Sequence, residues 1–247
     1  MEFARDPAFQ YVVRVREHIP LSKQMAATTS EFNSSNRYVT DHDASWQKQL
    51  DAGLRAMGLD SSSFQLQQLL AYLGLLLKWN AVYNLTAIRD PAHMVSRQLL
   101  DSLSILGLVK GPRVLDVGTG AGLPGVPLAI MLPGIEFTLL DTNSKKTRFV
   151  SQVKLELGLD NLMVVRQRVE EFRSPAGFDT ITSRAFATLV DMLLGSRHLL
   201  AEHGQWLAMK GQFPGREITT LDPSYKVRSE VLAVAGETGE RHAIIIQ

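Results

Sequence analysis

The sequence Arg113-Val-Leu-Asp-Val-Gly-Thr-Gly-Ala-Gly-Leu-Pro-Gly125 decides the fold of this chain. An apolar run ends there in three glycines at alternate positions, and an apolar helical pattern begins at once. This order predicts a buried strand that turns tightly into a helix. Glycine suits such a turn because it adopts unusual backbone angles and lets a ligand approach the backbone. The free N–H groups of a helix start also favour a carboxylate or a phosphate, so we expect a nucleotide-type ligand at this turn.

The spacing of the glycines separates two such ligands. The dinucleotide fingerprint has its third glycine three residues after the second, and that position is Leu123 here. Asp116 before the turn and Asp141 at the end of the next strand pattern are instead similar to the S-adenosylmethionine (SAM) site of Rossmann-like methyltransferases. We predict that Asp116 lies near the loop and the methionine end of SAM, and that Asp141 accepts hydrogen bonds from its ribose hydroxyls. A glycine-rich turn without a ligand stays open as the alternative.

Strand-like and helix-like segments alternate from residue 113 onward, which is typical of βαβ units and of a parallel, doubly wound sheet. The predicted strands are 113–117, 135–140, 162–166, 178–183 and 205–210, and the predicted helices are 123–132, 144–157 and 188–200. Two later strand-like runs, 225–234 and 242–246, leave no room for a crossover helix and predict an antiparallel hairpin. The expected fold is α/β: a Rossmann-like, SAM-dependent methyltransferase fold with a mostly parallel seven-stranded sheet.

A helical cap is predicted over residues 46–110, ahead of a SAM-binding domain at 111–247. A cap signal at residues 61–63 is followed by leucines at helical spacing, which we expect to be core: Leu66, Leu69, Leu70, Leu73, Leu76 and Leu77. Asp90 before Pro91 predicts the start of a second helix that runs to about residue 108.

Residues 1–45 form a polar, turn-rich stretch without sustained periodicity, which predicts a flexible extension. It is interpreted as a lineage-specific extension, a vector-derived leader, or the result of a start assigned upstream of Met25.

Composition limits the function further. The chain has 247 residues and no cysteine, so we expect no disulfide and no metal site. The lack of cysteine also argues against methylation at carbon-5 of pyrimidines, because that reaction generally uses a cysteine nucleophile. No apolar run approaches the roughly 20 residues of a membrane span, and we expect a cytoplasmic protein that is a monomer. The net charge is only +1, so any nucleic-acid surface must be a local patch.

Several further blocks of sequence identify a family. They are Lys78-Trp-Asn80, Tyr83-Asn-Leu-Thr86, Leu100-Asp-Ser102, Arg168-Val-Glu-Glu-Phe172, Ser183-Arg-Ala-Phe186, Lys210-Gly-Gln212 and Gly239-Glu-Arg-His242. With the glycine turn they resemble the RsmG (GidB) family of bacterial small-subunit rRNA guanine-N7 methyltransferases, over about residues 46–247. The resemblance implies methyl transfer from SAM to N7 of one guanine of 16S rRNA, guanine 527 of the 530 loop, in the small ribosomal subunit or its precursor. Arg97-Gln98 departs from the family's usual Arg-His, so an imidazole at that position cannot be essential here.

The resemblance and the chemistry of the wider class together give the expected cofactor contacts. By resemblance these include Val169, Glu170 and Arg184, and the full set is Asp116, Gly118, Gly120, Gly122, Leu123, Asp141, Val169, Glu170 and Arg184. The expected RNA contacts are basic side chains: Lys145, Lys146, Arg148, Arg197 and Lys210. Arg184 is expected to face both the cofactor and the target base.

The expected reaction needs no general base. Guanine N7 carries a free lone pair, and the methyl group of SAM is already activated, so catalysis should depend on orientation in a dry site, with Arg184 in a positioning role. N7 faces the major groove, which is closed to side chains in A-form RNA, so the target guanine must be in a loop or splayed out. Two other functions stay open: a non-catalytic SAM- and rRNA-binding assembly factor, and an NAD-dependent oxidoreductase.

Overall fold

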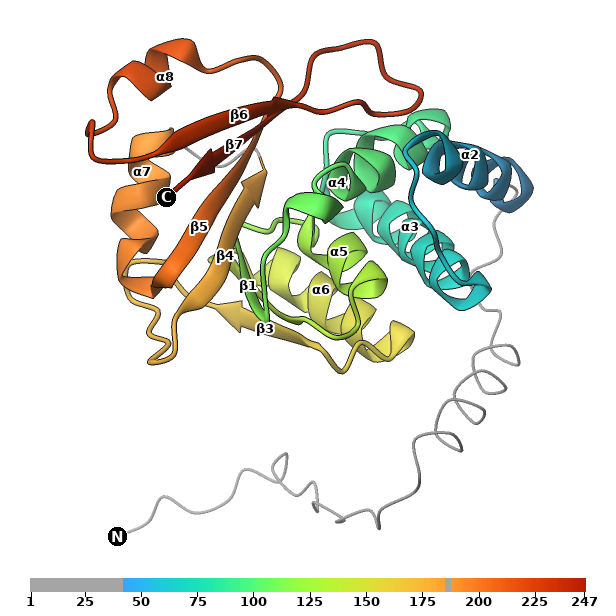
Figure 1. The fold of residues 1–247 in the computed structure, drawn as a ribbon. Coiled ribbons are helices and arrows are strands. Elements are labelled where there is room, and N and C mark those ends of the chain that lie inside the picture. Colours follow the sequence, from blue (N-terminus) through green and yellow to red (C-terminus); the bar gives the residue numbers. More distant parts are fainter. Residues whose placement is uncertain (1–41, 185–187) are drawn as a thin grey trace, which may run out of the picture. The chain divides into compact units, whose positions relative to one another are not determined.

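The computed structural model describes residues 42–184 and 188–247 (Figure 1). These residues belong to one compact unit. The predicted extension lies outside the described residues except for its last four, 42–45, which contain the start of the first described helix. Residues 185–187, which include the end of the Ser-Arg-Ala-Phe block, also lie outside.

Helical segments precede the sheet, and we call residues 43–108 the helical cap. Its elements are α2 (Asp43–Ala56), α3 (Ser63–Tyr83), η1 (Pro91–His93), η2 (Val95–Leu100), α4 (Asp101–Leu103) and η3 (Leu106–Leu108). The predicted cap signal starts α3, because the Ser62 hydroxyl accepts the Gln65 N–H while the Gln65 side chain accepts the Ser62 N–H.

The buried face of α3 is wider than the leucine pattern predicted. Leu69, Leu73 and Leu76 are buried, whereas Leu66, Leu70 and Leu77 are only partly covered. Tyr72 and Leu75 are buried as well. A helix that is covered on this many sides is held between other elements and does not lie on the surface with one apolar stripe.

The single helix predicted from residue 90 to about 108 is wrong in type. Asp90 does cap the segment through the Ala92 N–H, but the chain then passes through 3-10, π and short α turns. The Arg97 carbonyl accepts a hydrogen bond from the Arg184 guanidinium, and the Ser102 hydroxyl donates to the Gln98 carbonyl. Side chains that bind carbonyls in this way compete with a regular α-helical pattern, and π turns are frequent at functional sites.

The sheet follows the helical cap. Its elements and connecting helices are β1 (Arg113–Val117), α5 (Gly125–Met131), β2 (Glu136–Asp141), α6 (Ser144–Leu157), β3 (Leu162–Arg166), β4 (Phe178–Arg184), α7 (Leu189–Ser196), η4 (Arg197–Leu199), β5 (Leu200–Lys210), α8 (Gly215–Thr219), β6 (Val227–Val231) and β7 (His242–Ile246). The strand order is β3-β2-β1-β4-β5-β7-β6. Strands β1 to β5 pair in parallel, and β7 is antiparallel to both β5 and β6, so the predicted seven-stranded fold with a closing hairpin is confirmed.

The main error in the sheet concerns β5. It begins at Leu200, where the sequence pattern predicted the end of a helix, and its pairing with β4 shifts register between Phe178 and Thr180. His203 has a positive φ of 64° within this irregular part. An irregular strand start of this kind breaks the alternation of buried and exposed residues on which the prediction depended.

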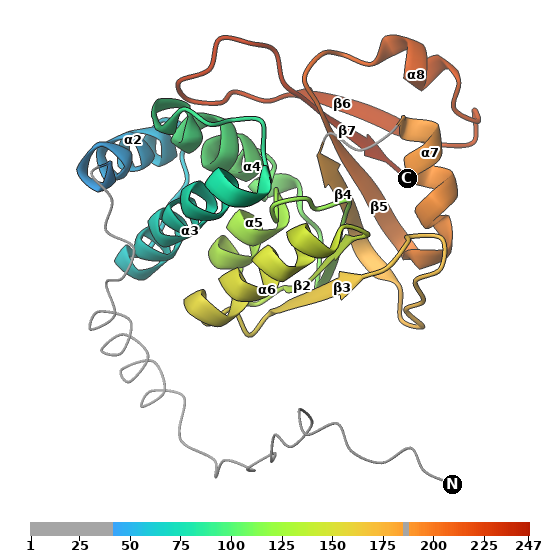
Figure 2. The same ribbon diagram turned by 180° about the vertical axis from the view of Figure 1, so that it is seen from behind.

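Helices cover both faces of the sheet. Figures 1 and 2 show α5 and α6 on one face and α7 on the other, and the core on the α7 face joins Leu189 and Met192 to Trp206 and Ile244. On the opposite face α3 covers α5 and α6, and its glutamines bind the last carbonyls of those helices: Gln65 binds Ile130 and Met131, and Gln68 binds Leu157. No helix in the part of the chain that the structure describes is both long and apolar enough to cross a membrane.

Candidate active site

The glycine loop, residues 118–122, joins β1 to the turn before α5. Its glycines have positive φ angles, and the N–H groups of Gly118 and Thr119 both bind the Leu140 carbonyl of the neighbouring strand. At Gly120, with φ of 61°, an added Cβ would meet only the Gly118 carbonyl oxygen and the Lys146 Nζ, each at 3.9 Å. The backbone conformation therefore requires glycine at 120, while the space beside it is open enough for a ligand.

Asp116 lies directly under this loop and is fully buried. Its Oδ2 accepts hydrogen bonds from the Thr119 hydroxyl at 2.6 Å and from the Gly125 N–H at 2.9 Å, while its Oδ1 is buried with no partner among the described residues. Burial raises the pKa of Asp116 to about 7, and the two hydrogen bonds and the Arg184 charge oppose that rise. The loop therefore covers a carboxylate with one oxygen still able to accept a hydrogen bond.

Asp141, at the end of β2, supports the loop from the other side. Its Oδ2 accepts the Gly120 N–H at 2.9 Å and its Oδ1 accepts the Asn143 N–H at 2.8 Å. Lys146 on α6 has its Nζ 3.9 Å from Asp141 Oδ2. Each carboxylate oxygen can accept more than one hydrogen bond, so Asp141 keeps capacity for hydroxyl donors.

Tyr72 fixes the loop from the helical cap. Its hydroxyl donates a 2.9 Å hydrogen bond to the Ala121 carbonyl, and both side chain and bond are buried. Burial raises the pKa of Tyr72 far above its ordinary value, so the hydroxyl stays a donor at any physiological pH. No local sequence pattern predicts this contact, because the two residues are 49 positions apart.

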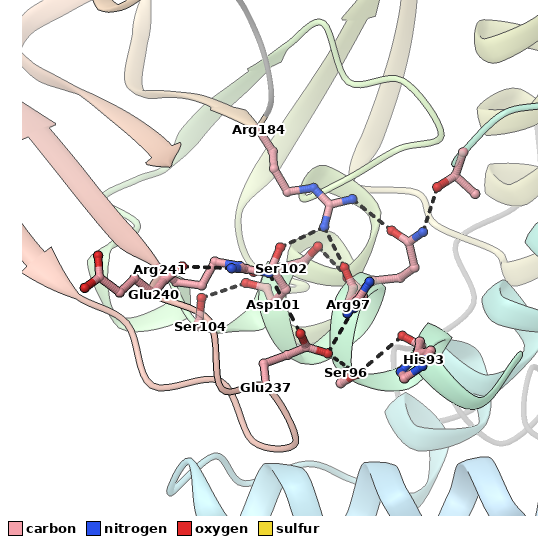
Figure 3. A network of polar contacts seen from close by, with 12 residues as sticks. His93, Ser96, Arg97, Asp101, Ser102, Ser104, Arg184, Glu237, Glu240 and Arg241 are labelled. Carbon is pink, nitrogen blue, oxygen red and sulfur yellow. Dashed lines mark hydrogen bonds and ion pairs between the residues drawn. The ribbon is translucent and has the colours of Figure 1, made fainter. Parts of the chain in front are cut away.

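Arg184, at the carboxyl end of β4, is bound by the helical cap (Figure 3). One guanidinium nitrogen donates to Asp101 Oδ2 and to the Arg97 carbonyl, both at 2.9 Å, and the other donates to Gln98 Oε1 at 2.9 Å. Gln98 also donates to the Thr86 hydroxyl at 2.9 Å. Gln98 therefore acts as a bridge at the position where the sequence departs from the usual histidine.

The same network reaches the loop between β6 and β7. Arg241 donates to Asp101 Oδ1 at 3.0 Å, so that Asp101 accepts from two arginines, one on each oxygen. Glu237 in turn accepts from the Ser96 hydroxyl at 2.7 Å and from Arg97 at 3.3 Å (Figure 3). We call this set of side chains the cap network: Ser96, Arg97, Gln98, Asp101, Arg184, Glu237 and Arg241.

A family model that describes rRNA small subunit methyltransferase G, GidB, matches residues 65–244. The chain belongs to the GidB family. It is 53% identical over 203 residues to the ribosomal RNA small subunit methyltransferase G of Ectopseudomonas mendocina, covering 81% of this chain and 95% of that protein. The protein of the same name from Pseudomonas aeruginosa is 52% identical over 211 residues, covering 85% and 97%. Among solved structures, a SAM-dependent methyltransferase from Aquifex aeolicus is similar with a TM-score of 0.48 and 19% identity, covering 64% of this chain and 93% of that chain.

Four of the GidB sequence blocks lie in two places in the structure. The glycine block forms the loop over Asp116, whereas the Leu-Asp-Ser, Ser-Arg and Gly-Glu-Arg-His blocks meet in the cap network through Asp101, Arg184 and Arg241. The charge of Arg184 still acts on both Tyr72 and Asp116, so the network borders the loop.

Val169 and Glu170 lie in the turn after β3, on the face that α7 covers. Val169 is buried in the core of that face, and Glu170 is exposed. The Glu170 Oε1 points toward Gly195 of α7, 3.7 Å from where a Cβ on that glycine would lie. Their expected contact with the cofactor stays a prediction.

The five basic side chains predicted to contact RNA differ in their exposure and in their partners. Lys145 and Arg148 are exposed near the start of α6, whereas Lys146 turns toward Asp141 and the glycine loop. Lys210 forms an ion pair with Glu217 at 2.9 Å. Arg197 follows α7 at the amino end of β5, the edge of the sheet opposite to the glycine loop. Lys145 and Arg148 are therefore the two that the structure brings together on an exposed surface.

Proposed function

We propose that this chain transfers the methyl group of SAM to N7 of a guanine in 16S rRNA, within the small ribosomal subunit or its precursor. As a GidB-family protein the chain is a SAM-dependent rRNA methyltransferase. The assignment of the target as guanine 527 of the 530 loop rests on the sequence resemblance. The observation that carries the proposal is the open glycine loop held between Asp116 and Asp141, in a chain that matches this family over residues 65–244.

The residues around the loop fit the cofactor. The positive φ angle and open space at Gly120 leave a cradle that a side chain would occupy, and Asp141 has accepting capacity for ribose hydroxyls. Asp116 lies buried directly beneath the loop, and its unpartnered Oδ1 keeps an acceptor position there. We assign the cofactor contacts to Asp116, Gly118, Gly120, Gly122, Leu123 and Asp141, and more remotely to Val169 and Glu170.

The cofactor supplies an electrophilic methyl group on a sulfonium. The chain then has to hold guanine N7 in line with that group and to exclude water, and orientation of this kind can lower a barrier by several kcal/mol, of the order of 7 or more for well-aligned reactants. No side chain has to remove a proton, because N7 presents a free lone pair. This reaction therefore needs no histidine base.

Arg184 has a positioning role in this proposal. Its guanidinium is engaged by Asp101, Gln98 and the Arg97 carbonyl, which fixes the carboxyl end of β4 against the helical cap. Ligands of open α/β sheets bind at the carboxyl ends of the strands, so this contact fixes the edge where the target base would enter. Arg184 would act through the shape of that edge more than through direct contact with the cofactor.

The test is methyl transfer from labelled SAM to small ribosomal subunits that were isolated from cells lacking this gene, followed by mapping of the modified base. Labelling at one guanine, with N7 as the modified atom, supports the proposal. SAM binding without transfer to subunits, precursor particles or naked rRNA would instead favour a non-catalytic assembly factor. Binding of NAD in place of SAM would favour an oxidoreductase.

We also propose a cytoplasmic monomer. Ribosomal subunits assemble in the bacterial cytoplasm, and residues 42–184 and 188–247 already contain a glycine loop with its supporting carboxylates in one chain. Sedimentation of the purified protein at several concentrations checks the oligomeric state. A dimer that persists on dilution contradicts this part of the proposal.

A further inference from the structure

The carboxyl-terminal end of α3 carries a pair of aromatic rings in tilted contact at the surface. The rings of Trp79 and Tyr83 have centroids 5.3 Å apart, and Trp79 also packs on the buried Phe149 of α6 at 5.6 Å. Tyr83 is 40% exposed. Phe149 thus supports Trp79 from below, and Trp79 in turn supports a ring that faces solvent.

The packing of α3 against α6 places a lysine beside this ring. The two helices lie side by side (Figure 2) and run antiparallel, because Gln68 at the start of α3 binds the Leu157 carbonyl at the end of α6, while Trp79 meets Phe149. Tyr83 is one turn beyond Trp79, and Lys145 is one turn before Phe149. This register places the exposed Lys145 and Tyr83 on neighbouring helices, each one turn from the Trp79–Phe149 contact and on the same side of it.

The exposed charges at the start of α6 are basic. The first turns of α6, residues 144–149, carry three basic side chains and no acidic one. Arg148 is exposed there, and Lys146 borders the glycine loop, with its Nζ 3.9 Å from Asp141 Oδ2. Exposure of a single aromatic residue is ordinary in proteins. A supported aromatic ring beside exposed cations at the rim of a cofactor loop is the combination that binds unpaired nucleic acid.

We infer that Trp79, Tyr83 and Lys145 form a base-stacking surface, on which an unpaired base of the rRNA stacks against Tyr83 while its phosphate meets Lys145. This inference rests on the proposed function and adds the surface that holds the RNA next to the target guanine. Guanine N7 is accessible only where the RNA is not a regular helix, so unstacked neighbouring bases are available. Aromatic stacking accepts any base, and the lysine adds a phosphate contact.

Tryptophan fluorescence tests the contact directly. The chain has three tryptophans, and Trp46 and Trp206 are 1% and 4% exposed, whereas Trp79 is partly exposed. Titration with naked 16S rRNA should quench the emission of the parent protein. Trp79→Phe should remove most of the quenching while the RNA still binds, as measured by filter retention. Quenching that persists in Trp79→Phe overturns the inference.

Substitution of Tyr83 separates stacking from other roles. We expect Tyr83→Ala to weaken binding of naked 16S rRNA about tenfold and to raise KM more than it lowers kcat, whereas Tyr83→Phe keeps the parental values. The matched control is Leu194→Ala on α7, since Leu194 is 64% exposed on the other side of the sheet. Unchanged SAM affinity and circular dichroism establish that Tyr83→Ala is folded.

Lys145→Ala should flatten the salt dependence of RNA binding by about one unit of log–log slope. Parental RNA affinity in Tyr83→Ala overturns the inference. A loss of affinity for small subunits without a loss of affinity for naked rRNA also overturns it, because the partner of Tyr83 is then a ribosomal protein. Methyl transfer by the parent protein is measured in parallel and tests the proposed function separately. If the parent protein transfers methyl groups and Tyr83→Ala keeps the parental RNA affinity, only the stacking surface is rejected.

Discussion

The glycine loop and the cap network lie next to each other but are built in opposite ways. The contacts that join the loop to Asp116 are short-range, since Thr119 to Asp116 spans 3 positions and Gly125 to Asp116 spans 9. Among the described residues its longest contact, from Tyr72 to Ala121, spans 49. The cap network is held by charged side chains far apart, with Arg184 to Asp101 spanning 83 positions and Arg241 to Asp101 spanning 140. The comparison shows that the glycine loop, the cofactor site that we propose, depends mainly on nearby stretches of sequence, while the cap network beside it is assembled from the whole chain.

The largest expected effect is on the loop. Gly120→Val should reduce SAM affinity more than 100-fold, about 2.7 kcal/mol or more, because a β-branched residue disfavours the positive φ angle and fills the ligand's space. Calorimetric titration with SAM measures it. Gly58→Val is the matched control, since Gly58 has a similar φ of 66° with nothing within 4 Å of an added Cβ. Parental SAM affinity in a folded Gly120→Val protein contradicts the assignment of the loop.

The next effect is on the cap network. Asp101→Ala leaves two largely covered arginines without their shared carboxylate, and we expect a loss of about 3 kcal/mol in the free energy of unfolding. Urea unfolding measures it, with Asp90→Ala as the control. Asp90 is an exposed cap in the same segment, for which a loss of about 1 kcal/mol is expected. Equal losses in the two variants would show that the network adds nothing beyond an ordinary surface contact.

A smaller effect depends on pH. Burial raises the pKa of Asp116 to about 7 from 3.8, so between these values the folded protein binds more protons than the unfolded chain. The contribution to stability is therefore complete below about pH 4 and is lost as the pH rises through about 7. From pH 5 to pH 8 the free energy of unfolding should fall by roughly 2 kcal/mol more in the cofactor-free parent protein than in Asp116→Asn. Parallel pH profiles of the two proteins refute this expectation.

The smallest effect separates two neighbouring lysines. Lys146 lies against Asp141, and Lys145 points into solvent. Lys146→Ala should weaken SAM binding by about threefold, roughly 0.6 kcal/mol, as expected for a partly exposed ion pair, and should leave the salt slope of RNA binding unchanged. Lys145→Ala should leave SAM binding unchanged and should flatten the salt slope of RNA binding. If both substitutions alter only RNA binding, the two lysines form one patch, as the sequence alone had suggested.

Local patterns explain how much of the fold the sequence could predict. Strands 113–117, 162–166 and 242–246 and helix 144–157 have the predicted bounds, because a short apolar run or helical spacing marks each of them. The helix predicted over residues 90–108 is wrong because Arg184, from β4, takes the Arg97 carbonyl. No pattern within that segment could reveal a competitor 87 positions away.

The residues of the candidate site also divide into those that a local sequence pattern predicts and those that it does not. Asp116 and Asp141 could be found because each follows a strand pattern and adjoins the glycines. Tyr72 and Asp101 were missed as site residues, since their partners lie 49 to 140 positions away, and Gln98 was noted only as a departure. Arg184 was predicted from the family resemblance, but its partners were not.

The sharing of Asp101 by two arginines also bears on the order in which the chain folds. Asp101 is synthesised before β1, Arg184 arrives only with β4, and Arg241 arrives after β6. The carboxylate lacks both partners until β4 is made and lacks Arg241 until β6 is complete, so the helical cap cannot reach its final arrangement as an independent early step. Contacts between residues this far apart form late, because a long loop of chain must first be closed. The helical cap and the last strands of the sheet should therefore become ordered together, in one cooperative event at the end of folding.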